Sequence, residues 1–454
     1  MLVVGDIGST FTKMILVTEE GELLGSVRAP TSRENLSAGV DAARERLAAA
    51  VGGRAEEAEL ILSSSAGGGL RVAVLGLEPA LTLAAGLRTS ATAGARIVAS
   101  YGAGESGRES SESFAAAQAD IALLTGGTDG GDEAGIVGHA EALKALAPGL
   151  PVVVAGNRTA CSAVLEALGN DREVRCVGNV MPRIGELSAE GAQAEIRALF
   201  IDHVIGHGRF ASASEVSQSI RMPTPAAVLA ATEAIADAAL SEETLRPVVV
   251  DVGGATTDVH SALPVEASGG AYVNTGLGDA RLTRTVEGDL GLRENAPAIL
   301  EAALLAGHPD AEIRPLAAPA ARRAANRAFV PAEEQERQVD RRLAGIATEI
   351  AVFRHAGRLR TVVTSEGTTF RKDGRDLREA TCAIATGGIF AAAEGAASIV
   401  EGALARVRER GGLVPPRLPV RLDRHYLLWA VGLLAAEHPE AAAGLVRTAL
   451  EGSG

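Results

Sequence analysis

One strand-and-turn unit occurs twice in this chain, and this duplication constrains the fold more than any other feature. From Leu2 to Lys13 the sequence reads LVVGDIGSTFTK, and from 248 to 259 it reads VVVDVGGATTDV. In each copy an apolar run leads to an Asp, then a Gly, then a cluster of small hydroxyl residues. An apolar run bounded by turn residues is typical of a buried strand. We interpret the two units as two sides of one nucleotide site.

The surrounding sequence indicates an α/β protein. Three short β-rich segments, LVVGDI, KMILVT and LLGSVRA, lie between 2 and 28 and predict an antiparallel meander. Apolar residues then recur at three- and four-residue spacing from Asn35 to Val51, which predicts a helix. Beyond residue 119, strand-like runs alternate with helical segments, a pattern that favours parallel pairing. The polar, Gly- and Ser-rich segment 101–119 is expected to be a hinge, a loop or a weak helix.

The composition excludes some classes of partner. The formal net charge is −14 and only 3% of the residues are aromatic. Nucleic acids and anionic membranes are bound through excess Lys and Arg, and single strands also through aromatic stacking. We therefore expect no nucleic-acid partner and no membrane partner. The apolar run from Leu427 to Ala436 is too short to span a bilayer.

The cysteines and the start of the chain favour a cytoplasmic location. Cys161, Cys176 and Cys382 form no C-x-x-C pair and lack the spacing of metal ligands. A sparse, odd number of cysteines is typical of reduced thiols in a cytosolic compartment. No basic segment followed by an apolar core opens the chain, so no secretory signal is predicted.

The two turns have the chemistry of a phosphate site. Glycines after a strand let backbone amides approach a ligand, and successive amides and hydroxyls in a tight turn bind anions. Asp6 and Asp251 are predicted to be catalytic and to recruit Mg²⁺ through its retained waters. A single Asp-x-Gly turn is typical of an ordinary hairpin, but two matched copies favour phosphate binding. The predicted nucleotide-binding residues are Gly8, Ser9, Thr10 and Lys13 in the first turn and Gly253, Gly254, Thr256 and Thr257 in the second.

A third glycine segment follows late in the chain. ATGGIF places Gly387 and Gly388 after a predicted strand and before an Ala-rich helix. Such glycines let the backbone lie against an adenine or a ribose, although a Gly-Gly pair also simply ends strands. The order of the three segments is what makes this one informative, and we predict that it contacts the adenosine.

These three segments, in this order, resemble the actin, sugar-kinase and heat-shock-chaperone superfamily, whose two ribonuclease-H-like halves clamp ATP and Mg²⁺. More closely, the chain is similar to the glutamate mutase accessory proteins called MutL, which are unrelated to the mismatch-repair protein of that name. The motifs that carry this likeness span essentially the whole chain: GDIGSTFTK, LLTGGTDGGD, VVVDVGGATTDV, TGLGD and DRHYLLWAVGLLA.

The resemblance implies an α/β fold in which two ribonuclease-H-like, actin-type ATPase domains flank a nucleotide cleft, with an extra α/β insertion. The first domain is expected at 1–245, with the insertion around 115–215, and the second at 246–454, with a helical subdomain around 280–375. The resemblance also implies ATP and Mg²⁺ as cofactors and a slow ATPase activity. The protein would then act as a reactivating chaperone whose partners are the subunits of an adenosylcobalamin-dependent mutase, and oligomer formation is compatible with this role.

Two other motifs have competing interpretations. In TGGTDGGDE (125–133), Asp129 is a candidate catalytic residue that orients water or binds metal, whereas the loop also suits a plain helix start. His203 and His207 have the spacing of zinc ligands on one helix face. The intervening residues lack the Glu of the H-E-x-x-H signature, so ordinary polar or partly buried histidines are the favoured interpretation.

The mechanistic hypothesis is that ATP·Mg²⁺ bridges the two turns and that hydrolysis lets the cleft open, which requires ATP and ADP to favour different closures. Two alternatives stay open. DVGGATTD also resembles the hydantoinase and oxoprolinase ATPases, so a related ATPase or a small-molecule kinase is possible. An actin-like scaffold would instead polymerise with nucleotide. The chain contains no G-x-x-x-x-G-K-[ST], which disfavours a P-loop ATPase.

Overall fold

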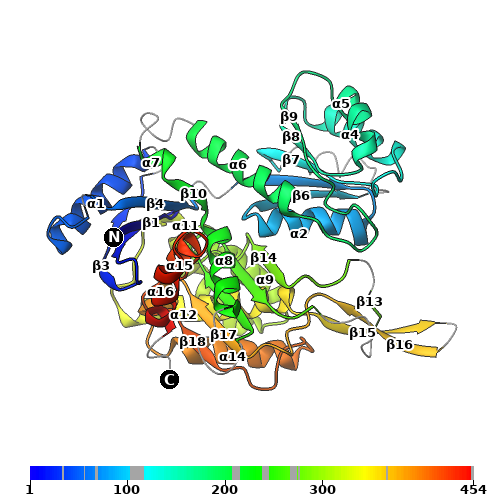
Figure 1. Cartoon of the computed structure of the whole chain (residues 1–454). Coiled ribbons are helices and arrows are strands. Elements are labelled where there is room, and N and C mark those ends of the chain that lie inside the picture. Colours follow the sequence, from blue (N-terminus) through cyan, green and yellow to red (C-terminus); the bar gives the residue numbers. More distant parts are fainter. Residues whose placement is uncertain are drawn as a thin grey trace. The chain divides into compact units, whose positions relative to one another are not determined.

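The computed structural model describes all residues except 33–34, 56, 67–69, 103–116, 207–214, 238–244, 266–272, 275–276, 365–366 and 451–454. Most of the segment 101–119, part of TGLGD, His207 and the side chain of His203 therefore lie outside the described residues. The chain forms two compact units (Figure 1). The larger unit comprises Met1–Gly67, His207–Tyr272 and Ala280–Gly454, and the smaller comprises Gly68–Gly206 and Val273–Asp279.

The first half of the larger unit is a five-stranded sheet with the order β10-β4-β1-β2-β3. Strand β1 pairs antiparallel with β2 and parallel with β4, and β2 pairs antiparallel with β3. The predicted meander of the first three strands is thus confirmed. The strands are β1 (Leu2–Ile7), β2 (Phe11–Val17), β3 (Leu23–Pro30), β4 (Glu59–Ser64) and β10 (Ile220–Pro223).

The predicted helix of the first half is confirmed as α1 (Leu36–Val51). The side chain of Asn35 caps its start by accepting a hydrogen bond from the amide of Ala38. Gly52 ends the helix in the left-handed conformation, with φ of 70°, which glycine adopts without strain. The helical periodicity of the sequence follows from burial of one face: Leu36, Val40, Ala43, Leu47 and Val51.

The second half repeats the sheet of the first. Its five strands have the order β14-β12-β11-β17-β18. Strand β11 pairs antiparallel with β12 and parallel with β17, as β1 does with β2 and β4. The duplication seen in the sequence therefore extends to the whole sheet. The strands are β11 (Pro247–Val252), β12 (Thr257–Ala262), β14 (Leu282–Glu287), β17 (Cys382–Thr386) and β18 (Val420–Leu422).

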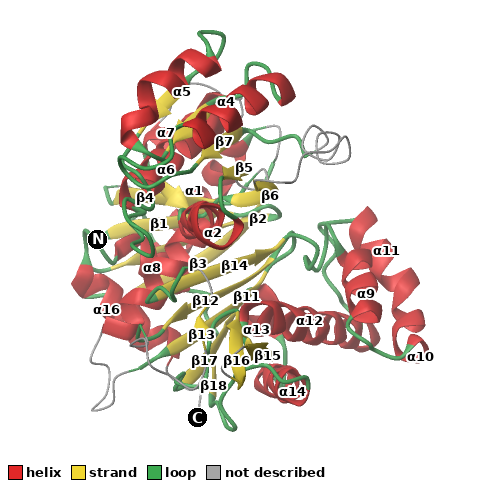
Figure 2. Ribbon diagram, turned by 90° about the vertical axis from the view of Figure 1, so that its right-hand side faces the viewer, coloured by secondary structure: helices red, strands yellow, loops and turns green. Residues whose placement is uncertain are grey.

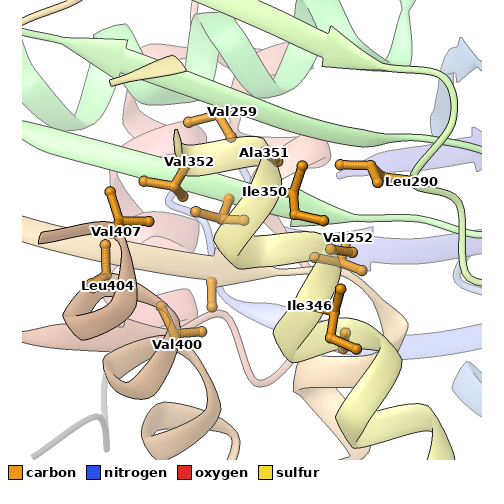
Figure 3. Packing of buried hydrophobic residues seen from close by; sticks show 14 of the residues in the cluster. Val252, Val259, Leu290, Ile346, Ile350, Ala351, Val352, Val400, Leu404 and Val407 are labelled. Carbon is orange, nitrogen blue, oxygen red and sulfur yellow. The ribbon is translucent and has the colours of Figure 1, made fainter. Parts of the chain in front are cut away.

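Helices α12 (Glu334–His355) and α14 (Ala396–Glu409) pack on this second sheet and form its main core (Figure 3). The cluster includes Ile346, Ile350 and Val352 from α12, Val252 and Val259 from the sheet, and Val400, Leu404 and Val407 from α14. The helical stretch observed here, α9 to α12, runs from Ala296 to His355. It is shorter than the expected 280–375, because β14 and a hairpin of β15 (Arg358–Thr364) and β16 (Gly367–Asp373) occupy the ends of that range.

The remaining helices of this half include α9 (Ala296–Leu305), α10 (Asp310–Ile313), a 3₁₀ turn at Arg314–Leu316, α11 (Ala317–Ala325) and α13 (Gly388–Ala392). Figure 2 shows α9, α10 and α11 grouped beyond one end of α12. No helix within the described part of the chain is both long and apolar enough to cross a membrane.

A second core joins the two halves of the larger unit. It contains Val4 and Ile15 from the first sheet, Val249 and Ile384 from the second, and the apolar faces of three helices. These helices are α8 (Thr224–Asp237), α15 (Leu428–Leu434) and α16 (Pro439–Leu450). Both sheets therefore direct alternate side chains, including those of Asp6 and Asp251, toward the side of this second core. A further short helix of the larger unit, α7 (Glu215–Gln218), precedes β10.

The smaller unit is a separate α/β fold whose five strands are all parallel, in the order β6-β5-β7-β8-β9. The predicted parallel pairing is confirmed, but the unit begins at Gly68, well before the expected 115. Its strands are β5 (Arg71–Gly76), β6 (Arg96–Gly102), β7 (Ile121–Leu124), β8 (Val152–Val154) and β9 (Val174–Cys176), with a two-residue strand β13 (Val273–Asn274). Its helices are a π-helical turn (Pro79–Leu83), α2 (Ala84–Thr92), α4 (Ala134–Leu146), a 3₁₀ turn (Arg158–Ala160), α5 (Cys161–Leu168) and α6 (Glu190–Gly206).

Candidate functional site

The two glycine turns have the same backbone structure. In the first, the amide of Gly8 donates to the carbonyl of Phe11 over 3.1 Å, and in the second the amide of Gly253 donates to Thr256 over 2.9 Å. A Cβ on Gly8 would lie 2.7 Å from the Phe11 oxygen, and one on Gly253 would lie 3.0 Å from the Thr256 oxygen. The first turn therefore needs glycine at this position, and a side chain at Gly253 would make an unusually tight contact, because the chain returns closely in both turns.

The second turn faces the first. A Cβ on Gly254 would lie 3.6 Å from the hydroxyl oxygen of Thr10, so the tips of the two turns are in contact range. Ser9, Thr10, Gly254 and Thr256 are all half-buried and keep part of their surface accessible. The structure thus brings together polar groups that are more than two hundred residues apart in the chain.

Asp6 sits at the base of the first turn in a fully bonded environment. Only 1% of Asp6 is exposed. Its Oδ2 accepts a hydrogen bond from Lys13 Nζ at 3.2 Å, directly across the β1–β2 pair. Its Oδ1 accepts from the hydroxyls of Thr224, at 2.6 Å, and Ser63, at 3.3 Å. This network of three hydrogen bonds holds the Asp6 carboxylate in one orientation.

Asp251 occupies the equivalent place in the second turn but has a different environment. Its strand partner is Asp258, an acid where the first half has Lys13. Asp258 is itself paired with Arg284 at 2.6 Å and accepts a hydrogen bond from Thr256 at 2.8 Å. Asp251 Oδ1 is buried and has no hydrogen-bond partner. This is the asymmetry that distinguishes the two halves.

The pKa of Asp251 reflects this isolation. Burial, together with the carboxylates of Asp258, Asp6 and Asp423, raises the pKa of Asp251 to about 7, and Lys13 offsets part of this rise. A carboxyl with a buried, unpartnered oxygen suits a divalent cation, which would supply the missing partner. The donors are all hard oxygens, which matches Mg²⁺ rather than a soft metal.

Lys13 is held from a second direction by Tyr426. The ammonium nitrogen lies 3.6 Å from the centre of the Tyr426 ring, a cation–π contact. Tyr426 has φ of 53°, which is uncommon for a residue other than glycine. Burial, followed by the nearby acids Asp251 and Asp6, raises the pKa of its hydroxyl well above the usual range. The hydroxyl therefore stays neutral.

Asp423 fixes the backbone that places Tyr426. Its buried carboxylate accepts hydrogen bonds from the amides of Leu427, at 2.8 Å, and Leu428, at 3.0 Å, at the start of α15. It also accepts from the hydroxyl of Thr386, at the end of β17, over 2.8 Å. Asp423 thereby connects the segment 423–426 both to helix α15 and to strand β17 of the second sheet.

Gly387 and Gly388 differ in their surroundings. Gly387 is buried with φ of 112°, and a Cβ there would lie 2.4 Å from the carbonyl oxygen of Val252. It is therefore required by the packing of β17 against β11. Gly388 is exposed and opens α13, and a Cβ there would meet nothing within 4 Å. Of the two, Gly388 is the one with free space for a ligand.

The predicted site residues are not equally available. The hydroxyl of Thr257 is buried and donates to the carbonyl of Leu290 at 2.8 Å, so only its backbone faces the turn. Asp129 belongs to the smaller unit, where its carboxylate binds Arg158 at 2.7 Å and Asn179 at 3.0 Å. Its catalytic role stays a prediction.

Several residues of this site were not identified by sequence reasoning. Ser63 and Thr224 stand in no recognisable motif with Asp6. Asp258 lies in the quoted VVVDVGGATTDV motif, and Asp423 and Tyr426 lie in DRHYLLWAVGLLA, but the sequence indicated no role for these three residues. An Asp a few residues before an apolar helical run is a helix-start signal, and it would have identified Asp423.

The fold and the site together define a class. Two halves with the same sheet topology, each presenting a glycine turn beside a buried aspartate, have the α/β architecture of the actin-like ATPases, here with an inserted parallel α/β unit. The expected fold class is confirmed.

The family is shown by sequence. Residues 2–450 match the model of the MutL protein family. The chain is also 33% identical over 455 residues to Protein MutL of Clostridium tetanomorphum, with 97% of each chain covered. The chain therefore belongs to the MutL family.

Two solved structures resemble this chain only distantly. The ethanolamine utilization protein EutJ from Carboxydothermus hydrogenoformans is 11% identical, with 98% of this chain and 89% of that chain covered and a TM-score of 0.29. Component A of the (R)-2-hydroxyglutaryl-CoA dehydratase of Acidaminococcus fermentans is 9% identical, with coverages of 100% and 98% and a TM-score of 0.27. These scores are too low to carry an assignment, which rests on the sequence matches.

Proposed function

We propose that this protein binds ATP and Mg²⁺ between its two glycine turns, hydrolyses ATP slowly, and serves as a reactivating chaperone for an adenosylcobalamin-dependent mutase such as glutamate mutase. The observation that carries the nucleotide part is the buried, unpartnered Asp251 oxygen beside the facing turns and Lys13. Membership of the MutL family supports the mutase part.

Each residue has a distinct proposed role. The amides of the two turns and the hydroxyls of Ser9, Thr10 and Thr256 bind the phosphates. Asp251 and Asp6 hold Mg²⁺, directly or through water, and the ion when bound neutralises phosphate charge and polarises the terminal phosphoryl group. Lys13 is kept beside the phosphates by its contacts with Asp6 and Tyr426.

The shared core between the halves suggests how nucleotide state would reach a partner. Thr224 opens α8 and donates to Asp6, whereas Asp423 holds the start of α15. Both helices belong to the core that joins the two sheets. A change in what Asp6 binds would therefore act on α8 directly, and the two halves would shift relative to each other. Such a shift needs ATP and ADP to bind the two closures unequally.

The nucleotide proposal predicts saturable binding of one ATP per chain in isothermal titration calorimetry when Mg²⁺ is present. The double variant Asp6→Asn plus Asp251→Asn should bind at least about 100-fold more weakly, because it removes both charged metal contacts. Asp41→Asn, at an exposed acid of α1 in the same unit, is the matched control and should bind as the wild type does. Folding of each variant is checked by circular dichroism, and equal affinity of the double variant and the wild type would contradict the site.

The chaperone proposal predicts that a mutase inactivated by cofactor damage regains activity when this protein, ATP, Mg²⁺ and fresh cofactor are added. ADP, or the double variant, should restore little. The mutase should also accelerate ATP hydrolysis. Acceleration by a small acceptor instead would favour a kinase or amidohydrolase, and nucleotide-dependent light scattering by the protein alone would favour a scaffold. Either result would overturn the chaperone role while leaving the nucleotide site intact.

A further inference from the structure

Two of the three cysteines lie together in the smaller unit. Cys161 Sγ and Cys176 Sγ are 2.6 Å apart, and both residues are free thiols. A disulfide bond is about 2.05 Å long, so the two sulfurs need to approach each other only slightly to reach bonding distance. The cysteines are 15 residues apart in the chain, and this proximity is not apparent from any sequence motif.

The surrounding fold explains why they meet. Cys176 ends β9, where it is in register with Val154 of the neighbouring strand β8. The chain leaving β8 forms the 3₁₀ turn Arg158–Ala160 and enters α5 at Cys161. The two cysteines therefore project from adjacent chain exits at the carboxyl edge of the parallel sheet. Cys176 is exposed and Cys161 is half-buried, so a small oxidant has access to the pair.

The Cys161–Cys176 pair is better suited to forming a disulfide than to binding a metal. Among the described residues, the one cluster of three potential ligand atoms is Glu59, Glu437 and His438, which does not include these sulfurs. Two thiols without a third ligand do not make a structural zinc site, which takes four ligands. Their chemistry as a close pair is thiol oxidation.

We infer that Cys161 and Cys176 form a reversible disulfide when the protein meets a peroxide. One molecule of hydrogen peroxide oxidises one of the two thiols to a sulfenic acid and releases water. The other sulfur then displaces the hydroxyl, which leaves as a second water with the proton of the second thiol, and the S–S bond forms. Two thiols lose two electrons and two protons in total, and the peroxide is reduced to two molecules of water.

Either sulfur is placed to act second, as the resolving group. The two sulfurs lie 2.6 Å apart, so a sulfenic acid formed on one of them is within reach of the other.

A disulfide between Cys161 and Cys176 would restrict the motion of a loop at the carboxyl ends of the parallel strands. Arg158, in the turn that leads to Cys161, donates to Asp129 through both its amide, at 3.2 Å, and its side chain, at 2.7 Å. Asn157 donates to the carbonyls of Gly131 and Asp132 in the same glycine-rich loop. A disulfide at Cys161 thus constrains the segment that holds this loop, and local opening of the loop should become rarer.

The test treats the full-length reduced protein with a small excess of hydrogen peroxide and measures intact mass and free thiols. The expected result is a loss of two mass units and of two of the three thiols, reversed by dithiothreitol, with a peptide map that joins Cys161 to Cys176. Cys382 should stay reduced, since it is buried and burial raises the pKa of its thiol. Hydrogen exchange across 125–132 should slow on oxidation.

Two variants separate the steps. Cys176→Ser and Cys161→Ser should each accumulate, on the cysteine that remains, a sulfenic acid that a dimedone probe traps, and neither variant should form the intramolecular disulfide. A disulfide between two molecules, a bond that includes Cys382, or unchanged mass at complete peroxide consumption would overturn the inference. ATP titration of the oxidised protein is independent of it, because the proposed nucleotide site lies in the other unit.

Discussion

Asp251→Asn is expected to make the protein more stable than the wild type at pH 8, when neither nucleotide nor divalent cation is present. The wild-type carboxylate is then charged, with a buried oxygen that no group bonds and with Asp258, Asp6 and Asp423 nearby. Asparagine has nearly the same shape and no charge. The raised pKa of Asp251, about 7 against an ordinary value of 3.8, corresponds to at most about 4 kcal/mol in the free energy of unfolding.

The stability advantage of Asp251→Asn over the wild type should increase with pH. The folded wild type binds the Asp251 proton more tightly than the unfolded chain does, so its stability falls as the pH rises from about 4 to about 7. Below pH 4 the carboxyl is protonated in both states, and the variant should have little advantage. Between these limits the advantage should grow, and above about pH 7 it should stay constant.

Urea unfolding from pH 4 to pH 8 measures this difference. Asp129→Asn is the control with the opposite sign, because hydrogen bonds from Asn179 and Arg158 lower the pKa of Asp129 despite partial burial. That variant should be less stable than the wild type at neutral pH and similar to it in acid. A difference between Asp251→Asn and the wild type that did not change with pH would show that Asp251 has a partner in the folded protein.

The same measurement links stability to the proposed site. Saturating ATP and Mg²⁺ should raise the stability of the wild type, because a ligand that binds only the folded state shifts the equilibrium toward it. Asp251→Asn should gain little. The unfavourable state of Asp251 in the free protein is thus the feature that a bound cation would relieve.

Gly432→Ala is expected to destabilise the larger unit by about 3 kcal/mol or more, a large value for adding one methyl group. A Cβ at this position would lie 1.7 Å from the carbonyl oxygen of Ala227 and 2.5 Å from its carbon. Both atoms are backbone of α8, so no flexible side chain can give way. Helices α15 and α8 would have to separate within the core that joins the two sheets.

Gly402→Ala in α14 is the matched control. It is also a helical glycine of the larger unit, but a Cβ there would meet only Arg406 Nη1, at an ordinary 3.8 Å. Alanine favours the helix at such a position, and we expect a gain of up to about 1 kcal/mol. Chemical denaturation followed by the fluorescence of Trp429, which lies in α15, measures both variants. Equal stability of Gly432→Ala and the wild type would mean that α15 and α8 are less closely packed than described.

The sequence by itself determined the elements whose signals are local. The duplicated strand and turn, the helix from Leu36 to Val51 and the parallel strands of the smaller unit each follow from periodicity or turn chemistry within a short window. The role of Gly8 and Gly253 in the two turns was also predictable, because a tight turn after a strand favours glycine independently of its surroundings. These signals need no knowledge of the rest of the chain.

Only the tertiary structure decided what stands around the two aspartates. Thr224 and Asp6 are 218 residues apart and yet share a hydrogen bond, and Tyr426 covers Lys13. The duplicated motifs gave no reason to expect that Asp6 is fully bonded whereas Asp251 is left with a free, buried oxygen. Such differences depend on which strands pair and which helix packs between the sheets. Hydrogen bonding and burial are properties of neighbours in space, and local sequence patterns carry little information about those neighbours.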